Sequence, residues 1–153
     1  MHIGSDHAGF QLKAILVGEL QQAGYEVVDH GAATYDASDD YPGFCIACAQ
    51  GVVDDLTGGV EALGVVLGGS GNGEQLAANL VKGARAVLVT HIDLATLGRL
   101  HNNANIIAIG ARFTAAEFAI ELVKTFLTTP FSEEARHVRR LQQMADFEAF
   151  GKF

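Results

Sequence analysis

A strand-like segment that leads through a glycine-rich turn into a helix-like segment is the strongest constraint on how this chain folds. Residues 63–67 are apolar, four glycines fall within residues 68–73, and residues 74–81 have helical character. A glycine-rich turn in this place lets backbone N–H groups approach an anion closely. The next side chain is Glu74, where a P-loop has a lysine, so the turn suits negative charge held beside an acid or base rather than a triphosphate.

Strand-like and helix-like segments alternate along the rest of the chain. Apolar, β-branched stretches predict strands at residues 1–3, 26–29, 63–67, 84–90 and 106–109. Helical spacing of apolar residues predicts helices at about 12–23, 42–53, 74–81, 93–101, 114–128 and 132–149. Pro42 is expected to open the second helix, and Thr114 and Ser132 are expected to begin the last two.

This alternation predicts an α/β fold, in which a mostly parallel sheet is covered by helices. In such folds, ligands bind outside the carboxyl ends of the strands. The loops that begin near Gly4, Gly68, Thr90 and Gly110 are therefore the first places to look for a site.

The composition indicates one globular domain of 153 residues, 49% hydrophobic and 18% charged. A net charge of −8 argues against a nucleic-acid surface. No apolar run is long enough to span a membrane and we see no signal peptide, so we expect a cytoplasmic protein. Cys45 and Cys48 lie in an apolar helix, and we interpret them as core residues rather than a redox pair or half a zinc site.

The first predicted strand is followed by Asp6 and His7 within a Gly-Ser-Asp-His-Ala-Gly segment. An acid beside an imidazole at a strand end suits proton transfer or hydroxyl binding. Alternatively, Asp6 caps a helix and His7 is a surface residue of its first turn. This segment alone leaves both interpretations open.

Glu74 also has two interpretations. An acidic residue at a helix N-terminus is stabilised by the helix dipole. A helix start alone, however, does not require four glycines. Their N–H groups could stabilise an enediolate oxygen while Glu74 takes a proton from carbon.

His101 precedes Asn102, Asn103 and Asn105, just before the last predicted strand. Asparagine is common at helix C-termini, which explains one or two of these residues but not the histidine. A neutral imidazole can exchange a hydrogen bond with a sugar ring oxygen, which is the functional interpretation of His101.

Cationic side chains gather on the last predicted helix, where Arg136 and Arg140 are four positions apart and therefore share a face. Two guanidinium groups on one face fit a phosphate. The alternative is a solvated basic face that pairs with Glu133 or Glu134. The chain has only ten lysines and arginines in total, so their concentration here favours an anion site.

Together, these segments resemble the ribose-5-phosphate isomerase B family, which includes the galactose-6-phosphate isomerase subunits. The matching segments, in family order over nearly the whole chain, are residues 4–9, 40–42, 68–75, 77–79, 101–105, 110–112 and 136–140. In many members a cysteine at the position of Gly68 is the catalytic base. Here Gly68 has no thiol, and the chain instead resembles the branch, typical of actinobacteria, in which a glutamate matching Glu74 is the base.

The resemblance implies a role for each matched residue. Glu74 would move the proton between C1 and C2, and His101 would open the furanose ring, assisted by Asp6. The enediolate would be held by the Ser70 hydroxyl and by the amides of Gly69, Ser70, Gly71, Asn72 and Gly73. Asn102 would bind sugar hydroxyls. The phosphate would be bound by His7, Arg136 and Arg140, assisted by His137, and by Arg112 from a second subunit.

The resemblance further implies a Rossmann-like α/β/α sandwich with a five-stranded parallel sheet, and no metal or organic cofactor. It implies a homodimer or a dimer of dimers with active sites shared across the interface, where helix 132–149 packs on or reaches the partner subunit. The expected reaction interconverts ribose 5-phosphate and ribulose 5-phosphate.

Three alternatives remain. The substrate could be a four-carbon sugar phosphate (erythrose or erythrulose 4-phosphate) or a six-carbon one (allose or galactose 6-phosphate). The chain could instead be a nucleotide-binding module, although Glu74 stands where the G-x-G-x-x-G pattern needs its last glycine. It could also be a non-catalytic subunit, although every expected catalytic group is present.

Overall fold

Five parallel strands form the centre of the molecule, in the order β2-β1-β3-β5-β4. The computed structural model describes residues 1–152. Its strands are β1 (His2–Ser5), β2 (Val28–Asp29), β3 (Gly64–Gly68), β4 (Ala86–Leu88) and β5 (Ile106–Gly110). The prediction of an α/β fold with a five-stranded parallel sheet is confirmed.

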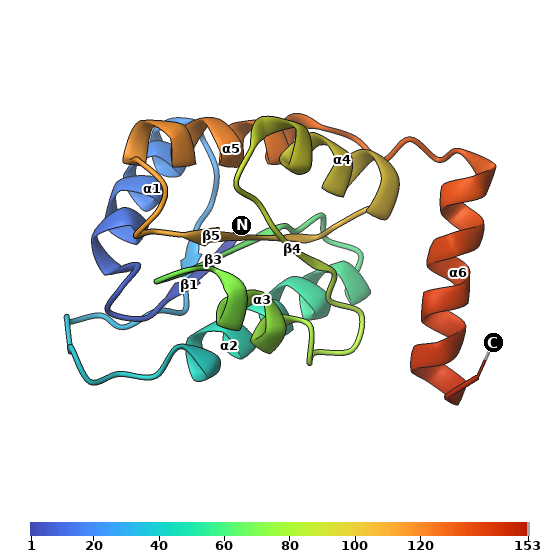
Figure 1. Cartoon of the computed structure of the whole chain (residues 1–153), viewed down its shortest axis with the longest axis horizontal. Coiled ribbons are helices and arrows are strands. Elements are labelled where there is room, and N and C mark those ends of the chain that lie inside the picture. The colour runs from blue at the N-terminus through green and yellow to red at the C-terminus, as the bar shows by residue number, and fades with distance from the viewer. Residues whose placement is uncertain (153) are drawn as a thin grey trace.

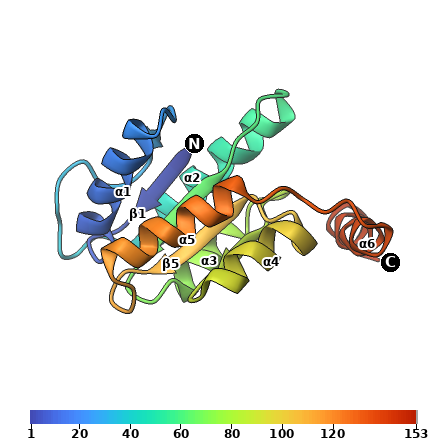
Figure 2. The same ribbon diagram turned by 90° about the horizontal axis from the view of Figure 1, so that it is seen from above.

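Helices cover both faces of this sheet (Figure 1). They are α1 (Phe10–Gln22), α2 (Tyr41–Thr57), α3 (Asn72–Ala78), α4 (Ile92–Asn102), α5 (Ala116–Thr128) and α6 (Ala135–Phe150). Helices α1, α4 and α5 lie on one face and α2 and α3 on the other. Helix α6 stands apart from these three layers, at one side of the molecule (Figures 1 and 2).

The two central strands, β3 and β5, are buried along their whole length because helices pack on both faces. On the α1–α5 face, side chains such as Val65 and Ile107 join a core with Phe126. On the α2–α3 face, Cys45 and Cys48 are fully buried in a second core. The interpretation of both cysteines as core residues is confirmed.

Two predicted helix starts are wrong. Thr114 does not cap α5, which begins at Ala116 after Ala115, with no side-chain cap. Helix α6 begins three residues after Ser132, because Glu133 has a left-handed backbone (φ +54°) that interrupts a helix. The Ser132 hydroxyl instead accepts a hydrogen bond from the Glu134 amide in the turn before the helix.

Helix α6 is amphipathic, and side chains of its apolar face are exposed. Val138, Met144 and Phe150 are 46%, 57% and 72% exposed. Apolar surface gathered on one helix favours contact with another surface. Within residues 1–152, no helix is both long and apolar enough to cross a membrane.

Candidate active site

The glycine-rich turn after β3 leads directly into α3 at the carboxyl end of the sheet. Gly71 has a left-handed backbone (φ +82°), and a side chain there would meet Leu88 and the backbone of Gly110. Only glycine fits this position. The backbone amides of Ser70 and Gly71 donate no hydrogen bond within the described part of the chain, so they are available to an oxyanion.

The side chain of Glu74 folds back over Gly68. A Cβ atom on Gly68 would overlap the Glu74 carboxylate. Any side chain at position 68 would therefore exclude the rotamer that Glu74 adopts here. Glu74 is only 4% exposed, and its Oε2 atom has no hydrogen-bond partner among residues 1–152. The carboxylate therefore lies where a side chain at position 68 would lie, with one oxygen uncommitted.

Two residues of α2 lie against this turn, and neither was among the expected site residues. The Tyr41 ring lies on Gly73, where an added Cβ would be 2.6 Å from the Tyr41 hydroxyl oxygen. Burial, and next the charge of Glu74, raise the pKa of the Cys45 thiol. Cys45 is thus a neutral thiol, near enough to Glu74 for the carboxylate charge to influence its pKa. The signal for Tyr41 was its place in the matched segment 40–42.

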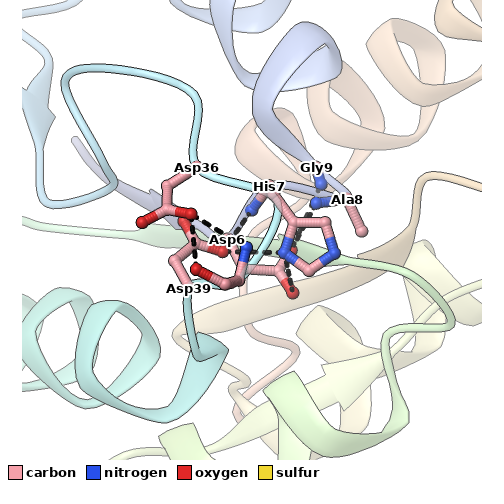
Figure 3. A network of polar contacts seen from close by, with 7 residues as sticks. Asp6, His7, Ala8, Gly9, Asp36 and Asp39 are labelled. Carbon is pink, nitrogen blue, oxygen red and sulfur yellow. Dashed lines mark hydrogen bonds and ion pairs between the residues drawn. The ribbon is translucent and has the colours of Figure 1, made fainter.

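At the end of β1, Asp6 and His7 have separate roles. Oδ1 of Asp6 accepts hydrogen bonds from the backbone amides of Ala8 (2.9 Å) and Gly9 (3.3 Å), which orders the turn into α1. The His7 Nδ1 atom lies 2.7 Å from Oδ1 of Asp39 and 3.9 Å from Oδ2 of Asp6 (Figure 3). Sequence reasoning missed Asp39, which comes from the long polar loop before α2.

The pKa of His7 is raised above its ordinary value of 6.5. The hydrogen bond to Asp39 is the main cause, opposed by partial burial and supported by the charges of Asp6 and Asp39. This part of the site therefore favours an imidazolium ion.

Asp6, His7 and Asp39 are also of the kinds that bind metals, and their candidate ligand atoms lie within 4.8 Å of one another. Two ligands of one zinc ion stand about 3.3 Å apart in a tetrahedral site, given metal–ligand distances near 2 Å. The 2.7 Å between Nδ1 of His7 and Oδ1 of Asp39 is instead a hydrogen-bond distance. The geometry fits a shared proton better than a shared cation.

Arg112 follows β5 and lies beside the glycine-rich turn. Its backbone amide donates to the Gly69 carbonyl oxygen (3.2 Å), and its guanidinium lies 3.3 Å from the place of a Cβ on Gly69. This position differs from the expectation that a second subunit supplies Arg112.

The residues at the carboxyl end of the sheet, here called the glycine-loop cluster, are Asp6, His7, Asp39, Tyr41, residues 68–74 and Arg112.

A second group of expected site residues lies where α4 meets α6. The rings of His101 and His137 pack with their centroids 4.2 Å apart, and Nδ1 of His137 is 2.9 Å from the Ser132 hydroxyl. Arg136 pairs with Glu134 at 2.8 Å, as the alternative interpretation of this helix expected. The residues His101, Asn102, Arg136, His137 and Arg140 are here called the α4–α6 cluster.

Burial, and then the positive charges of His101 and Arg136, lower the pKa of His137 below its ordinary value of 6.5, while Glu134 opposes them. His137 is 2% exposed. The α4–α6 cluster thus holds a neutral imidazole, in contrast to His7.

The two clusters lie at opposite ends of the sheet within one chain. Helix α4 runs antiparallel to the strands, and its 11 residues span about 16 Å. His101 and Asn102 therefore lie near the amino ends of the strands, close to Asn105, which pairs with the first residue of β3. No described contact joins His101 to Asp6 or Glu74, so a single chain does not give His101 the expected help of Asp6.

A cavity of about 580 Å³ at the amino end of the sheet includes Arg85 and Arg99 in its wall. Arg85 donates to the Asn103 carbonyl oxygen (2.9 Å), and Arg99 donates to the Asn103 side chain (3.1 Å). Asn103 has a left-handed backbone (φ +43°) and ends α4. The two arginines thus fix the turn that follows His101 and Asn102.

Known proteins match nearly the whole chain. Residues 1–144 match the sequence profile of the Ribose/Galactose Isomerase family. The ribose-5-phosphate isomerase B proteins of Mycolicibacterium paratuberculosis and Mycobacterium tuberculosis are each 49% identical over 148 residues, covering 97% of this chain and 91% and 89% of theirs. The crystal structure of ribose-5-phosphate isomerase B from Mycoplasma genitalium with bound ribulose-5-phosphate has a TM-score of 0.91 and 37% identity, covering 97% of this chain and 95% of that chain.

Proposed function

Because this chain belongs to the ribose/galactose isomerase family and is an aldose–ketose isomerase, we propose that it interconverts ribose 5-phosphate and ribulose 5-phosphate. The names of the two mycobacterial relatives and the ribulose-5-phosphate in the Mycoplasma genitalium structure support this substrate. A cytoplasmic location, as the sequence predicts, belongs to the same proposal.

Glu74 is the base of the proposed reaction. It removes the proton from C2 of the open-chain aldose, the electron pair of that C–H bond forms the C1–C2 double bond, and the carbonyl oxygen on C1 becomes negatively charged. The proton of the C2 hydroxyl then moves to the C1 oxygen. The electron pair left on the C2 oxygen forms the C2 carbonyl as the same carboxyl group protonates C1, which gives the ketose. The observation that carries this proposal is the buried Glu74 carboxylate, folded over Gly68 with Oε2 uncommitted.

The amides of the glycine-rich turn stabilise the enediolate. The Ser70 and Gly71 N–H groups point from a fixed backbone and have no other partner in the described chain, so they need no rearrangement to receive a negative oxygen. The Ser70 hydroxyl, which now accepts weakly from Asn72 at 3.3 Å, can rotate toward the sugar.

A second copy of the chain completes the site. The α4–α6 cluster of one copy would face the glycine-loop cluster of the other, so that His101 opens the sugar ring and Asn102 binds hydroxyls. The apolar side chains that α6 exposes support such a dimer, with the helix lying on the partner.

The phosphate then lies between groups of both copies. The cations His7 and Arg112 lie on one side, and the cations Arg136 and Arg140, assisted by the neutral ring of His137, lie on the other. The ion pair between Arg136 and Glu134 joins side chains that are more than half exposed, and such pairs contribute about 0–1 kcal/mol. A phosphate dianion can therefore replace Glu134 at small cost.

A panel of ribose 5-phosphate, erythrose 4-phosphate, allose 6-phosphate and galactose 6-phosphate, assayed with and without EDTA, tests the proposed function. We expect kcat/KM for ribose 5-phosphate to exceed that of each other sugar by about tenfold or more, since pocket contacts to one carbon unit discriminate by this order. EDTA should leave the rate unchanged. A higher kcat/KM for another sugar would correct the substrate, and no turnover of any sugar would indicate a non-catalytic subunit.

A further inference from the structure

The Asp39 carboxylate contacts His7 at two atoms. Its Oδ1 accepts from the His7 backbone amide at 2.8 Å and from the ring Nδ1 at 2.7 Å. Within residues 1–152, no other group donates to this carboxylate, and its Oδ2 is buried without a hydrogen-bond partner. The Asp39 side chain is 10% exposed. Its charge is therefore directed at a single neighbour.

Asp6 is the obvious alternative partner of His7, but its geometry assigns it elsewhere. Its Oδ1 is bound by the amides of Ala8 and Gly9, and its Oδ2 is 3.9 Å from the His7 ring, beyond hydrogen-bond distance. Figure 3 shows the two carboxylates at the same nitrogen of the His7 ring, with the second nitrogen on the side away from these contacts. Asp39 is thus the residue that sets the orientation of the ring.

A carboxylate at Nδ1 also determines when Nε2 can donate a hydrogen bond. An ionised carboxylate only accepts hydrogen bonds, so Nδ1 must carry a proton. In a neutral ring with that proton, Nε2 is an acceptor and repels a phosphate oxygen. In the imidazolium form, Nε2 is a donor and binds the phosphate with a charge-assisted hydrogen bond.

We propose that Asp39 is a positioning residue that holds His7 as a phosphate donor, with Nδ1–H on the carboxylate and Nε2–H directed to the phosphate of the substrate. The proposal rests on the proposed sugar-phosphate isomerase function. The raised pKa of His7, with Asp39 as its main cause, agrees with this geometry.

The carboxylates of Asp6 and Asp36 also favour the charged form of the His7 ring. Asp6 lies close to Nδ1, and Asp36, in the same loop as Asp39, is near enough for the charge of His7 to influence its pKa. The Asp36 carboxylate accepts its hydrogen bonds from Ser38 rather than from His7. The Tyr35 ring meets the His7 ring edge-on, with centroids 6.4 Å apart. Asp36 therefore offers a matched control for the loss of one negative charge from this loop.

The first experiment follows the His7 ring by NMR in ligand-free protein, assigned with the variant His7→Asn. Asp39→Asn keeps an oxygen for the backbone amide of His7 but removes the charge. We expect the pKa of His7 to fall by about one unit or more in Asp39→Asn, and by less in Asp36→Asn. An equal His7 pKa in the wild type and in Asp39→Asn would overturn the proposal.

The second experiment measures ligand binding and turnover. Asp39→Asn should raise KM for ribose 5-phosphate, and Kd for inorganic phosphate, about tenfold at pH 7.5, with kcat within about twofold. Asp39→Glu, which keeps the charge, should recover part of the loss. A kcat defect with unchanged KM and Kd would contradict a role in phosphate binding.

The ring titration uses no substrate, so it distinguishes two kinds of failure. A normal His7 shift together with no turnover of ribose 5-phosphate would reject the proposed function and leave the Asp39–His7 pair intact. Turnover of ribose 5-phosphate with no His7 shift would reject only the role of Asp39.

Discussion

The glycine-loop cluster and the α4–α6 cluster hold complementary parts of the proposed site but are built differently. The first is formed by three strand ends and a turn in which Gly71 permits no other residue, and its carboxylate Glu74 is buried. The second depends on a helix that stands apart from the body, and its arginines are exposed. Proton transfer at carbon requires fixed geometry, whereas binding a phosphate tolerates movement. The rigid cluster therefore suits the chemistry, and the open cluster suits capture of the substrate.

The largest effect should come from the rigid cluster. Glu74→Gln keeps the size of the side chain but removes the base, so kcat should fall about 10²–10⁴-fold with little change in substrate affinity. Steady-state kinetics and calorimetric binding of ribulose 5-phosphate measure the two quantities separately. Near-normal turnover would remove Glu74 from its role and reverse the comparison between the clusters.

Mixing two inactive variants tests whether the clusters that work together belong to different chains. Glu74→Gln impairs only the glycine-loop cluster, and His101→Asn only the α4–α6 cluster. In a mixed dimer, one of the two shared sites then has both clusters intact. After unfolding and refolding an equal mixture, random pairing in a twofold dimer should restore about a quarter of wild-type activity. No recovery would mean that each chain works alone, provided that refolded wild type is active.

A methyl group on Gly68 of the glycine-loop cluster should also lower kcat. Gly68→Ala places a Cβ where the Glu74 carboxylate lies, so Glu74 must adopt another rotamer. Displacing a catalytic group by about 1 Å costs roughly 10²-fold, and we expect kcat to fall by that order. Gly43→Ala is a suitable control, because an added Cβ there meets no atom within 4 Å. Equal kcat for Gly68→Ala and wild type would show that Glu74 is less constrained than the structure indicates.

In the open cluster, losing one cation should affect binding more than chemistry. Arg140→Ala should raise KM for ribose 5-phosphate about tenfold and leave kcat within about threefold, because it removes a contact to the non-reacting phosphate. Arg139→Ala, an exposed neighbour outside the cluster, provides the control. If KM stays the same in Arg140→Ala, the phosphate does not bind on this face of α6.

The smallest effect, and the one that contrasts the clusters most directly, is their response to pH. His7 has a raised pKa, so its contribution to stability is fully present below pH 6.5 and is lost as the pH rises through the folded value. His137 has a lowered pKa, so its site is stable above pH 6.5 and loses stability as the pH falls through its folded value. Hydrogen exchange at pH 7.5 and 5.5, corrected for intrinsic rates, should show α6 loosening on acidification while residues 31–40 do not. A change of the same sign in both segments would contradict this difference.

The sheet could be predicted because its central strands have a strong signal. Residues 64–68 and 106–110 are apolar without alternation, as expected for strands buried on both faces. The edge strands were predicted too long. The strand predicted at residues 26–29 has only two residues in the structure, and the strand predicted at residues 84–90 has only three. At a sheet edge, β-branched residues occur in extended segments that have no partner strand to pair with, so composition overestimates strand length.

The site was predictable only in part. Gly68 and Glu74 lie in one continuous segment, so sequence alone brought them together. Asp39 lies in a polar loop with Asp36 and Asp40, and nothing in the sequence distinguishes the carboxylate that reaches His7 from its neighbours. His101 was expected beside Asp6, but a helix that returns along the sheet carries it to the other end, which only the topology reveals.

The overlap between a side chain at position 68 and the Glu74 carboxylate also limits which pairs of residues these two positions can hold. A cysteine placed at position 68 of this chain would have its Cβ atom where the Glu74 carboxylate lies. A protein with both side chains would have to move one of them. The two positions are therefore coupled, and we expect the effect of a substitution at position 68 to depend on which side chain stands at position 74.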